Sequence, residues 1–453
     1  MDATKLYGVK PRETARSTVR RAWVIVALLF FFQVINYADK NVLGLAKAGI
    51  MHDMNLTNIE WGYIGSSFFI LFPLSSIAFG FVANRRPSRW LLLGMGAMWA
   101  LTQFPMVATV GAGTLLTCRI LLGAAEGPGY PVALHATYKW FPNQKRTLPT
   151  SLLVLGGGVG ASLAGLILPQ IIQAWDWHAA FLAVGAAGVV WSLAWLLLGR
   201  EGTIQDEPHA AAAAGDRVPY RDLVLNPTAL GVFLIGFAAY WSIGVGISWG
   251  PGYLHEAVGL TQIQAGEAFI LPTIVAVFVG PLIGYASQTL FRRGVSSRLS
   301  RGAFGCAGVV IGGSAIAGMA LAGNATAAIG GFTFPIAVAW FTFANVVMYT
   351  IYAVGPPILA EIAPSGQRAT LLAINNAIYS SAGIIAPTVM GYVLTWAPDV
   401  LTGYRNGYLL LAAILIGAGI GGYALISPAR DGARLSARRR RADGSLAGMS
   451  PAE

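Results

Sequence analysis

The sequence predicts an all-α polytopic membrane protein in which twelve transmembrane helices form two six-helix bundles. The 453-residue chain is 55% hydrophobic and only 11% charged, whereas about a quarter of the residues in a soluble domain are charged. Apolar stretches of about 20 residues, the length that crosses a bilayer core, recur from end to end. Positive charge is confined almost entirely to alternate connections between them. These three observations leave no room for a large soluble domain.

Each apolar stretch is bounded by a polar or basic connection, which gives the expected spans in order. The longest polar connection, residues 201–226, lies in the middle of the chain and is typical of a linker. We expect a cytoplasmic N-terminal segment at 1–21, an N-terminal six-helix bundle at 22–199, a cytoplasmic linker at 200–227, a C-terminal six-helix bundle at 228–427 and a cytoplasmic basic tail at 428–453. The twelve expected spans are 22–46, 60–83, 89–110, 112–138, 147–173, 179–199, 228–253, 263–291, 301–322, 326–355, 369–396 and 404–427.

The basic residues predict the orientation of the chain. Of the 30 Lys and Arg residues, all but Lys40, Lys47, Arg119 and Arg405 fall on one side of the expected membrane. Cytoplasmic loops carry such an excess, so we expect both termini in the cytoplasm and the chain in a plasma membrane, as in a bacterial inner membrane. The net charge of +11 is spread over alternate loops, which argues against a nucleic-acid partner. Membrane lipid and small solutes are the expected partners, and the expected functional unit is a monomer.

The two halves carry similar motifs. Residues 142–146 follow the fourth span and read P-x-x-x-R, and residues 364–368 follow the tenth span with the same pattern. Residues 80–83 in the second span are loosely similar to residues 284–287 in the eighth. Parallel six-helix repeats are one plan on which transporters are built, so the halves are expected to share a topology.

Four ionisable residues stand inside otherwise apolar spans. Asp39 and Lys40 lie in the first, and Arg119 and Glu126 lie in the fourth. Such residues are costly in lipid and are functional by default, facing a cavity or one another. Residues 119, 123, 126 and 130 fall on one helical stripe. Gly123 is expected to leave an open notch between the cation and the carboxylate.

The motifs around these charges resemble those of a known family. The chain is similar to the major facilitator superfamily and, within it, to the anion:cation symporter family of organic-acid transporters. Residues 36–40 match its N-Y-x-D-R pattern, with Lys40 in place of Arg, and residues 119–131 match its R-x3-G-x2-E-G-x3-P signature. Residues 80–89 are similar to the superfamily loop after the second helix, with Asn84 where Asp is usual. The resemblance implies that the first and fourth helices line one central cavity together.

The resemblance and the charges together indicate coupling of an anion to protons. A carboxylate in a partly desolvated cavity favours its neutral form, so Asp39 and Glu126 are the expected proton-coupling residues. The expected substrate-binding residues of this half are Lys40, Arg119, Tyr37 and Asn36. Arg119 is expected to pair with Glu126 or Asp39 until protonation of the acid releases the cation to the substrate's carboxylate. The alternative is a static ion-pair network that holds the two helices together.

The C-terminal half offers aromatic and amide side chains instead of confident intramembrane charges. Asn376 and Tyr379 are the expected substrate-binding residues there, and Tyr379 stands where relatives of the implied family have Gly. Gly156–Gly158 in the fifth span occupy positions that are often polar in sugar-acid relatives, which favours a less hydroxylated or aromatic acid. The candidate surface also includes Tyr240, Trp241, Trp249, Trp340, Phe341, Asn345, Tyr349, Tyr352, Asn375 and Ser380.

We therefore expect a secondary active transporter that imports a small organic carboxylate, a sugar acid or an aromatic acid, together with protons by alternating access. A proton-driven exporter, a passive facilitator or exchanger, and a transporter-like membrane sensor of an organic anion are the alternatives. No cluster of His, Cys or acidic residues has metal-ligand spacing, and no nucleophile–base pair stands out. We expect no cofactor, no metal and no enzymatic activity.

Overall fold

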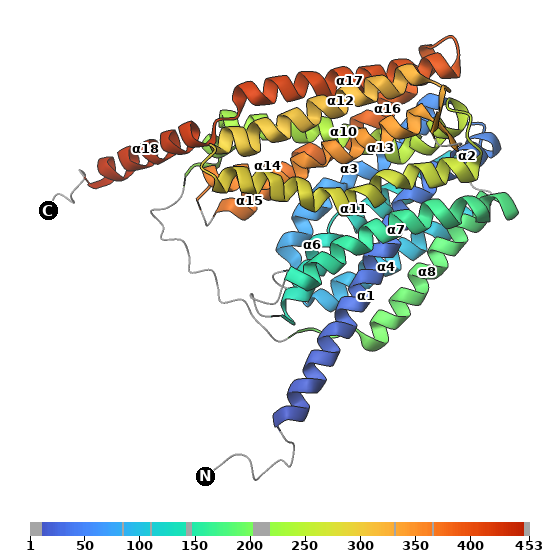
Figure 1. The fold of residues 1–453 in the computed structure, drawn as a ribbon. Coiled ribbons are helices and arrows are strands. Elements are labelled where there is room, and N and C mark those ends of the chain that lie inside the picture. Colours follow the sequence, from blue (N-terminus) through green and yellow to red (C-terminus); the bar gives the residue numbers. More distant parts are fainter. Residues whose placement is uncertain are drawn as a thin grey trace.

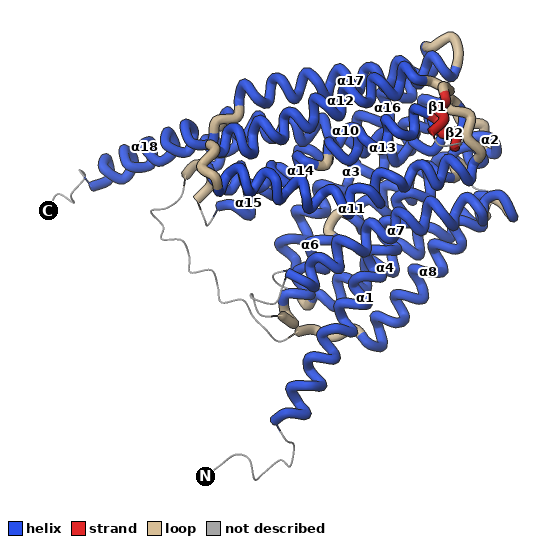
Figure 2. The backbone as a smooth tube through the Cα atoms, viewed as in Figure 1, coloured by secondary structure: helices blue, strands red, loops and turns tan. Residues whose placement is uncertain are grey.

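A computed structural model describes residues 11–83, 86–108, 111–141, 147–202, 218–329, 332–364 and 367–447. Asn84, residues 142–146 of the repeated motif and residues 203–217 of the expected linker lie outside the described residues. Helices dominate the described chain, and Figure 2 shows a single short pair of strands. The helices before the linker are α1 (Pro11–Leu45), α2 (Lys47–Asp53), α3 (Asn58–Ala83), α4 (Ser88–Gln103), the 3-10 turn η2 (Phe104–Val107), α5 (Ala112–Glu126), α6 (Gly129–Tyr138), α7 (Thr147–Ala174) and α8 (Trp177–Leu198).

The second half begins with the short helix α9 (Tyr220–Val224) and repeats the pattern of long apolar helices. Its elements are α10 (Pro227–Glu256), α11 (Gln262–Arg292), the π-helical turn η5 (Arg298–Ala303), α12 (Phe304–Ala322), β1 (Thr326–Ile329), β2 (Phe332–Pro335), α13 (Ile336–Met348), α14 (Thr350–Ile362), α15 (Arg368–Ser380), α16 (Ala382–Trp396), α17 (Val400–Leu425) and α18 (Pro428–Ala447).

Side-chain caps fix where several of these helices begin. Asp176 accepts a hydrogen bond from the Ala179 N–H at the start of α8, and Asp399 accepts one from the Thr402 N–H at the start of α17. Thr261 begins α11 with a reciprocal capping box. Because the first N–H groups of a helix have no partner within it, these short polar side chains set the boundaries.

Eleven helical stretches in the described chain are long and apolar enough to cross a membrane. The remaining expected span, the fourth at 112–138, is divided between α5 and α6, which meet at Gly127 and Pro128. Proline lacks the N–H that a continuous helix needs, so the helix is interrupted at Pro128. As a result, neither α5 nor α6 alone reaches the length of a span. Together with the eleven stretches, α5 and α6 are consistent with twelve membrane crossings.

The expected start of the tenth span was wrong. The strands β1 and β2 form an antiparallel pair, which we call the hairpin, in which Thr326 pairs with Pro335 and Ile329 with Phe332. The membrane-spanning stretch runs over Ile336–Ile362 instead. A short apolar run does not distinguish strand from helix by hydropathy, and Pro335 at the N-cap of α13 marks the boundary.

The long helices run side by side in two groups that converge at one end (Figure 1). The halves contact each other mainly through the pairs α3–α16 and α7–α11, with further contacts of α10 with α1, α2 and α3 and of α15 with α3. Figure 1 shows the groups diverging toward the end where α1 begins and α18 projects. They meet at the opposite end, near α2 and the hairpin. We call the end near α2 and the hairpin the distal end.

Glycines and hydrogen bonds join the halves at the distal end. A Cβ atom built on Gly44 would lie 2.1 Å from the Ile247 carbonyl oxygen, and one on Gly391 would lie 2.4 Å from that of Asn58. Such small residues let helices approach closely. The cross-half hydrogen bonds include Trp61 Nε1 to Ser248 O (3.0 Å), Tyr63 Oη to Tyr392 Oη (2.7 Å) and Ser66 Oγ to Thr388 Oγ1 (2.8 Å).

Candidate functional site

The four charged residues predicted from the sequence come together in the structure. Asp39 and Lys40 lie on α1, and Arg119 and Glu126 lie on α5. The Asp39, Arg119 and Glu126 residues are 0%, 3% and 2% exposed. Lys40 Nζ lies 3.3 Å from Glu126 Oε2, which makes a largely buried ion pair between the two helices. Asp39 also lies within electrostatic range of both cations and of Glu126.

The pairing within this group differs from the expectation. Arg119 was expected to pair with Glu126 or Asp39, but Lys40 is the ion-pair partner of Glu126. The Arg119 guanidinium lies over the Phe68 ring at 4.8 Å, and its Nε and Nη1 atoms have no hydrogen-bond partner. The flexible four-carbon stem of Lys40 lets its ammonium reach Glu126 on the neighbouring helix. The Arg119 guanidinium therefore has N–H donors that are available to a ligand.

Neighbouring amides orient the remaining charges. Lys40 Nζ donates to Asn36 Oδ1 at 2.7 Å and lies 4.6 Å from the centre of the Tyr37 ring. Gln103 on α4 donates to Asp39 Oδ1. Asp39 Oδ2 and Asn36 Nδ2 are buried without a partner. Buried polar atoms are normally paired, so this group has unused capacity for a ligand or a proton.

Gly123 does not leave the open notch that the sequence suggested. A Cβ atom built at this position would lie 1.8 Å from the Phe68 carbonyl oxygen. The glycine therefore lets α5 pack directly on α3, and backbone fills the space between Arg119 and Glu126. Its role in the structure is helix packing.

We expect Gly123→Ala to destabilise the protein by about 1–3 kcal/mol, the usual cost of overpacking, because the obstructing atom belongs to the backbone. Gly94→Ala is the matched control, since a Cβ atom added at Gly94 would meet no other atom within 4 Å. The measurement is Tm of each purified variant in detergent. Equal Tm values for the two variants would contradict the packing role.

The two predicted residues of the C-terminal half lie on α15. The Tyr379 ring centre is 5.5 Å from that of Tyr240 on α10 and 5.8 Å from that of Tyr352 on α14. Tyr379 also lies within electrostatic range of Tyr37, which belongs to the other half. Asn376 is half-buried on the same helix. Tyr379 thus belongs to an aromatic group that is close to the charged residues.

Sequence reasoning missed a second ion pair, between a buried lysine and an exposed glutamate, which joins the halves at the distal end. Lys47 was treated as a loop residue, and Glu256 was not singled out. Lys47 Nζ lies 2.7 and 2.8 Å from the two carboxylate oxygens of Glu256 and 3.0 Å from Tyr404 Oη. It also lies 4.9 Å from the Trp249 ring centre. The sequence signal for this pair was a charged residue at the end of each of two apolar spans. The fold brings these two chain segments together.

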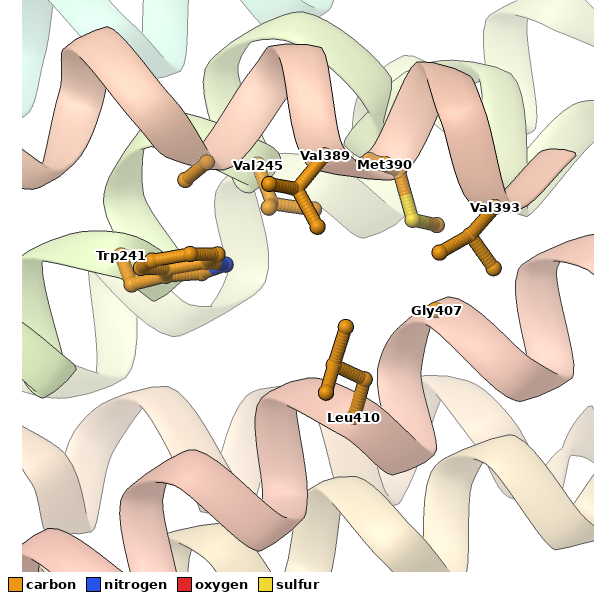
Figure 3. A pocket seen from close by; sticks show the side chains of 8 residues that line it. Trp241, Val245, Val389, Met390, Val393, Gly407 and Leu410 are labelled. Atoms are coloured by element: carbon orange, nitrogen blue, oxygen red, sulfur yellow. The ribbon is translucent and has the colours of Figure 1, made fainter.

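A separate shallow groove lies between α10, α16 and α17 (Figure 3). Apolar side chains line it, including Trp241, Met390 and Leu410. It contains no charged group, so it does not suit an anion. Among the described residues, no group of three or more His, Cys, Asp or Glu side chains could hold a metal ion.

The fold and these residues define a polytopic helical protein with a buried charged site between α1 and α5. The sequence profile of the Major Facilitator Superfamily matches residues 29–352. The chain belongs to this superfamily, and it is a membrane transporter and not an enzyme. The resemblance noted in the sequence is confirmed.

Known proteins similar to this chain include transporters with sugar-acid names. The D-galactonate transporter of Escherichia coli O6:H1 is 26% identical over 62% of this chain and 70% of its own length. The hexuronate transporter of Bacillus subtilis is 24% identical over 86% of this chain and 90% of its own length. A bacterial homologue of the human lysosomal transporter Spinster, solved in an inward-facing, unoccupied conformation, has a TM-score of 0.71 at 17% identity, over 92% of this chain and 98% of that one.

Proposed function

We propose that this protein is a secondary active transporter that imports a small organic carboxylate together with protons. The observation that carries the proposal is the buried Lys40–Glu126 ion pair, with Asp39 and the incompletely bonded Arg119 beside it. Intramembrane charges of this kind mark transport pathways. The sugar acids in the relatives' names carry a carboxylate, the group that two buried cations would attract.

Charge balance supplies the coupling mechanism. Two carboxylates and two cations make the empty site neutral overall, and a substrate carboxylate would add one uncompensated negative charge. Protonation of Glu126 would neutralise it and free Lys40 from its ion pair. Lys40 and the free donors of Arg119 could then bind the substrate. The site thereby stays electrically neutral overall in both states, which avoids the large cost of an uncompensated buried charge.

Alternating access follows from the way the halves meet. With both termini in the cytoplasm, as the basic loops predict, the distal end faces outward, and its contacts close the site to the outside. Opening would separate α3 from α16 and α7 from α11, the main pairs that join the halves. The two bundles, residues 22–199 and 228–427, would then rock about the charged site. The proposed setting is a bacterial inner membrane and the proposed unit is a monomer.

Uptake into proteoliposomes tests the proposal. Radiolabelled hexonates, hexuronates, benzoates and phthalates are supplied outside, with and without an inward-directed proton gradient. We expect the gradient to drive accumulation of at least one acid, and a protonophore to abolish it. Uptake that equilibrates without accumulation would indicate a facilitator. Saturable binding without any flux would indicate a membrane sensor, and gradient-driven efflux an exporter.

A further inference from the structure

A buried amide on α4 lies against Asp39, one of the two carboxylates of the charged site. Gln103 is the last residue of α4 and is 2% exposed, and its side-chain amide donates a hydrogen bond to Asp39 Oδ1. The second carboxylate oxygen, Asp39 Oδ2, is buried and has no hydrogen-bond partner among the described residues. The Gln103 amide is therefore the hydrogen-bond donor that the described structure provides for this carboxylate.

The two carboxylates of the site have partners of different kinds. Glu126 is paired with a cation, Lys40, whereas Asp39 is bonded to a neutral amide. A cation favours only the ionised form of its partner. An amide can donate an N–H to a carboxylate and, after rotation, accept the O–H of the carboxylic acid through its own oxygen. Gln103 can therefore stay bonded to Asp39 before and after a proton binds.

The amide nevertheless favours the ionised form of Asp39. A hydrogen bond to an ionised group is roughly twice as strong as one between neutral groups, and a bond to the charged form of an acid opposes its protonation. Loss of the Gln103 amide would therefore let Asp39 take up a proton at a higher pH. The side chain at this position thus adjusts when Asp39 is protonated.

Packing against α8 fixes the Gln103 side chain. The helices α4 and α8 lie side by side, and a Cβ atom built on Gly185 of α8 would lie 3.1 Å from Gln103 Cβ. The glycine leaves room for the glutamine stem and little more. The neighbouring Thr102 is also buried, but its hydroxyl donates to Trp99 O on its own helix at 2.9 Å. Gln103 is thus the residue through which this end of α4 contacts Asp39.

The contact lies on the side of the site from which protons would enter. The helix α4 begins at Ser88, beside the basic connection, and ends at Gln103 on the opposite side. Asp39 lies near the end of α1, which runs toward the distal end (Figure 1). With the distal end facing outward, as in the proposed function, Asp39 and Gln103 lie toward the outside.

We propose that Gln103 is the positioning residue of Asp39 and that its amide sets the external pH range over which proton-driven uptake operates. This inference rests on the proposed function and adds to it a residue that acts through Asp39. The charged neighbours of Asp39 are Lys40 on its own helix and Arg119 and Glu126 on α5. The helices α7, α8 and α10 also pack on α1, and their described residues add no charged neighbour of Asp39.

The initial rate of uptake into proteoliposomes, measured over a series of external pH values at one internal pH, tests the inference. The probes are the radiolabelled hexonates, hexuronates, benzoates and phthalates that wild type accumulates. Gln103→Met keeps the length of the side chain and removes the amide. The external pH of half-maximal rate should rise by about one unit, as expected for a lost hydrogen bond to a charged group. Thr102→Val, which removes a neighbouring buried hydroxyl, is the matched control and should keep the wild-type value.

A second pair of variants leaves Gln103 in place. Gly185→Ala would press a Cβ atom on the Gln103 stem and should raise the half-maximal pH by a smaller amount. Gly188→Ala is its control, because a Cβ atom there would lie 3.3 Å from Ala100 Cβ and would not meet Gln103. This pair carries the test if Gln103→Met does not fold.

The outcomes separate this inference from the proposed function. An unchanged half-maximal pH in folded Gln103→Met would overturn the inference and leave the transporter function intact, and so would an equal rise in Thr102→Val. If Gln103→Met does not fold, equal values for Gly185→Ala and Gly188→Ala would overturn it. Absence of gradient-driven accumulation of every acid by wild type would overturn the proposed function itself.

Discussion

Glu126→Gln is expected to abolish proton-driven accumulation of substrate while leaving substrate exchange across the membrane intact. Glutamine has the shape of a protonated glutamate and carries no charge. The variant should therefore resemble the loaded, protonated state, in which Lys40 is free to bind the substrate. Exchange of internal for external substrate needs only that state. Net accumulation also needs the empty transporter to return, and that step requires the ion pair to re-form.

The expected size of the effect follows from the burial of the site. In the Glu126→Gln variant, the empty transporter would hold Lys40 without its carboxylate partner. An unpaired buried charge costs about 3–5 kcal/mol, which slows the return step on the order of a hundredfold or more. Substrate counterflow in proteoliposomes measures exchange, and uptake under an inward proton gradient measures accumulation.

Two further variants complete this experiment. Asp39→Asn tests the second proposed proton-coupling residue in the same two assays. Glu267→Gln is the matched control, because Glu267 is exposed near the start of α11. Accumulation by Glu126→Gln at the wild-type level would contradict the coupling role and support a static ion pair between α1 and α5.

The sequence was sufficient for the fold and for the position of the charged site. Charges such as Asp39 and Glu126 are conspicuous inside apolar spans, and the spans themselves follow from hydropathy. Their convergence could be expected only from the family resemblance, because α1 and α5 are separate in the chain. The exact partner of Glu126 depended on side-chain reach and on the packing of Arg119 over Phe68.

Other features depend on contacts that no local pattern encodes. Gly123 lies between Arg119 and Glu126 in the sequence, yet its role is determined by its contact with the backbone of Phe68 on another helix. Lys47 and Glu256 each lie at the end of an apolar stretch, where a charged residue is ordinary. Only the meeting of the two halves shows that they are partners. Interactions between halves are thus the part of the structure that sequence patterns predict least well.

The largest expected change in conformation comes from breaking the Lys47–Glu256 ion pair. Lys47 comes from the N-terminal half, and its partners Glu256 and Tyr404 come from the C-terminal half. The Lys47 side chain is only 4% exposed. Loss of Glu256 would leave the buried Lys47 charge unpaired, at a cost of about 3–5 kcal/mol, whereas loss of Lys47 would leave only the exposed Glu256 carboxylate. Since about 5.5 kcal/mol inverts a two-state population from 99:1 to 1:99, Glu256→Gln should favour an open distal end more strongly than Lys47→Met.

A double-mutant cycle with spin labels measures this shift. Labels at His52→Cys and Trp396→Cys, both exposed at the distal end, report the separation of the halves after the native Cys118 and Cys306 are replaced. Lys47→Met and Glu256→Gln should each lengthen this distance. The double variant should lengthen the distance less than the sum of the two single variants, because no unpaired charge remains.

The control is Arg301→Met, which breaks an Arg301–Glu361 pair within the C-terminal half and should leave the distance unchanged. Unchanged distances in both single variants would show that helix packing alone keeps the distal end closed.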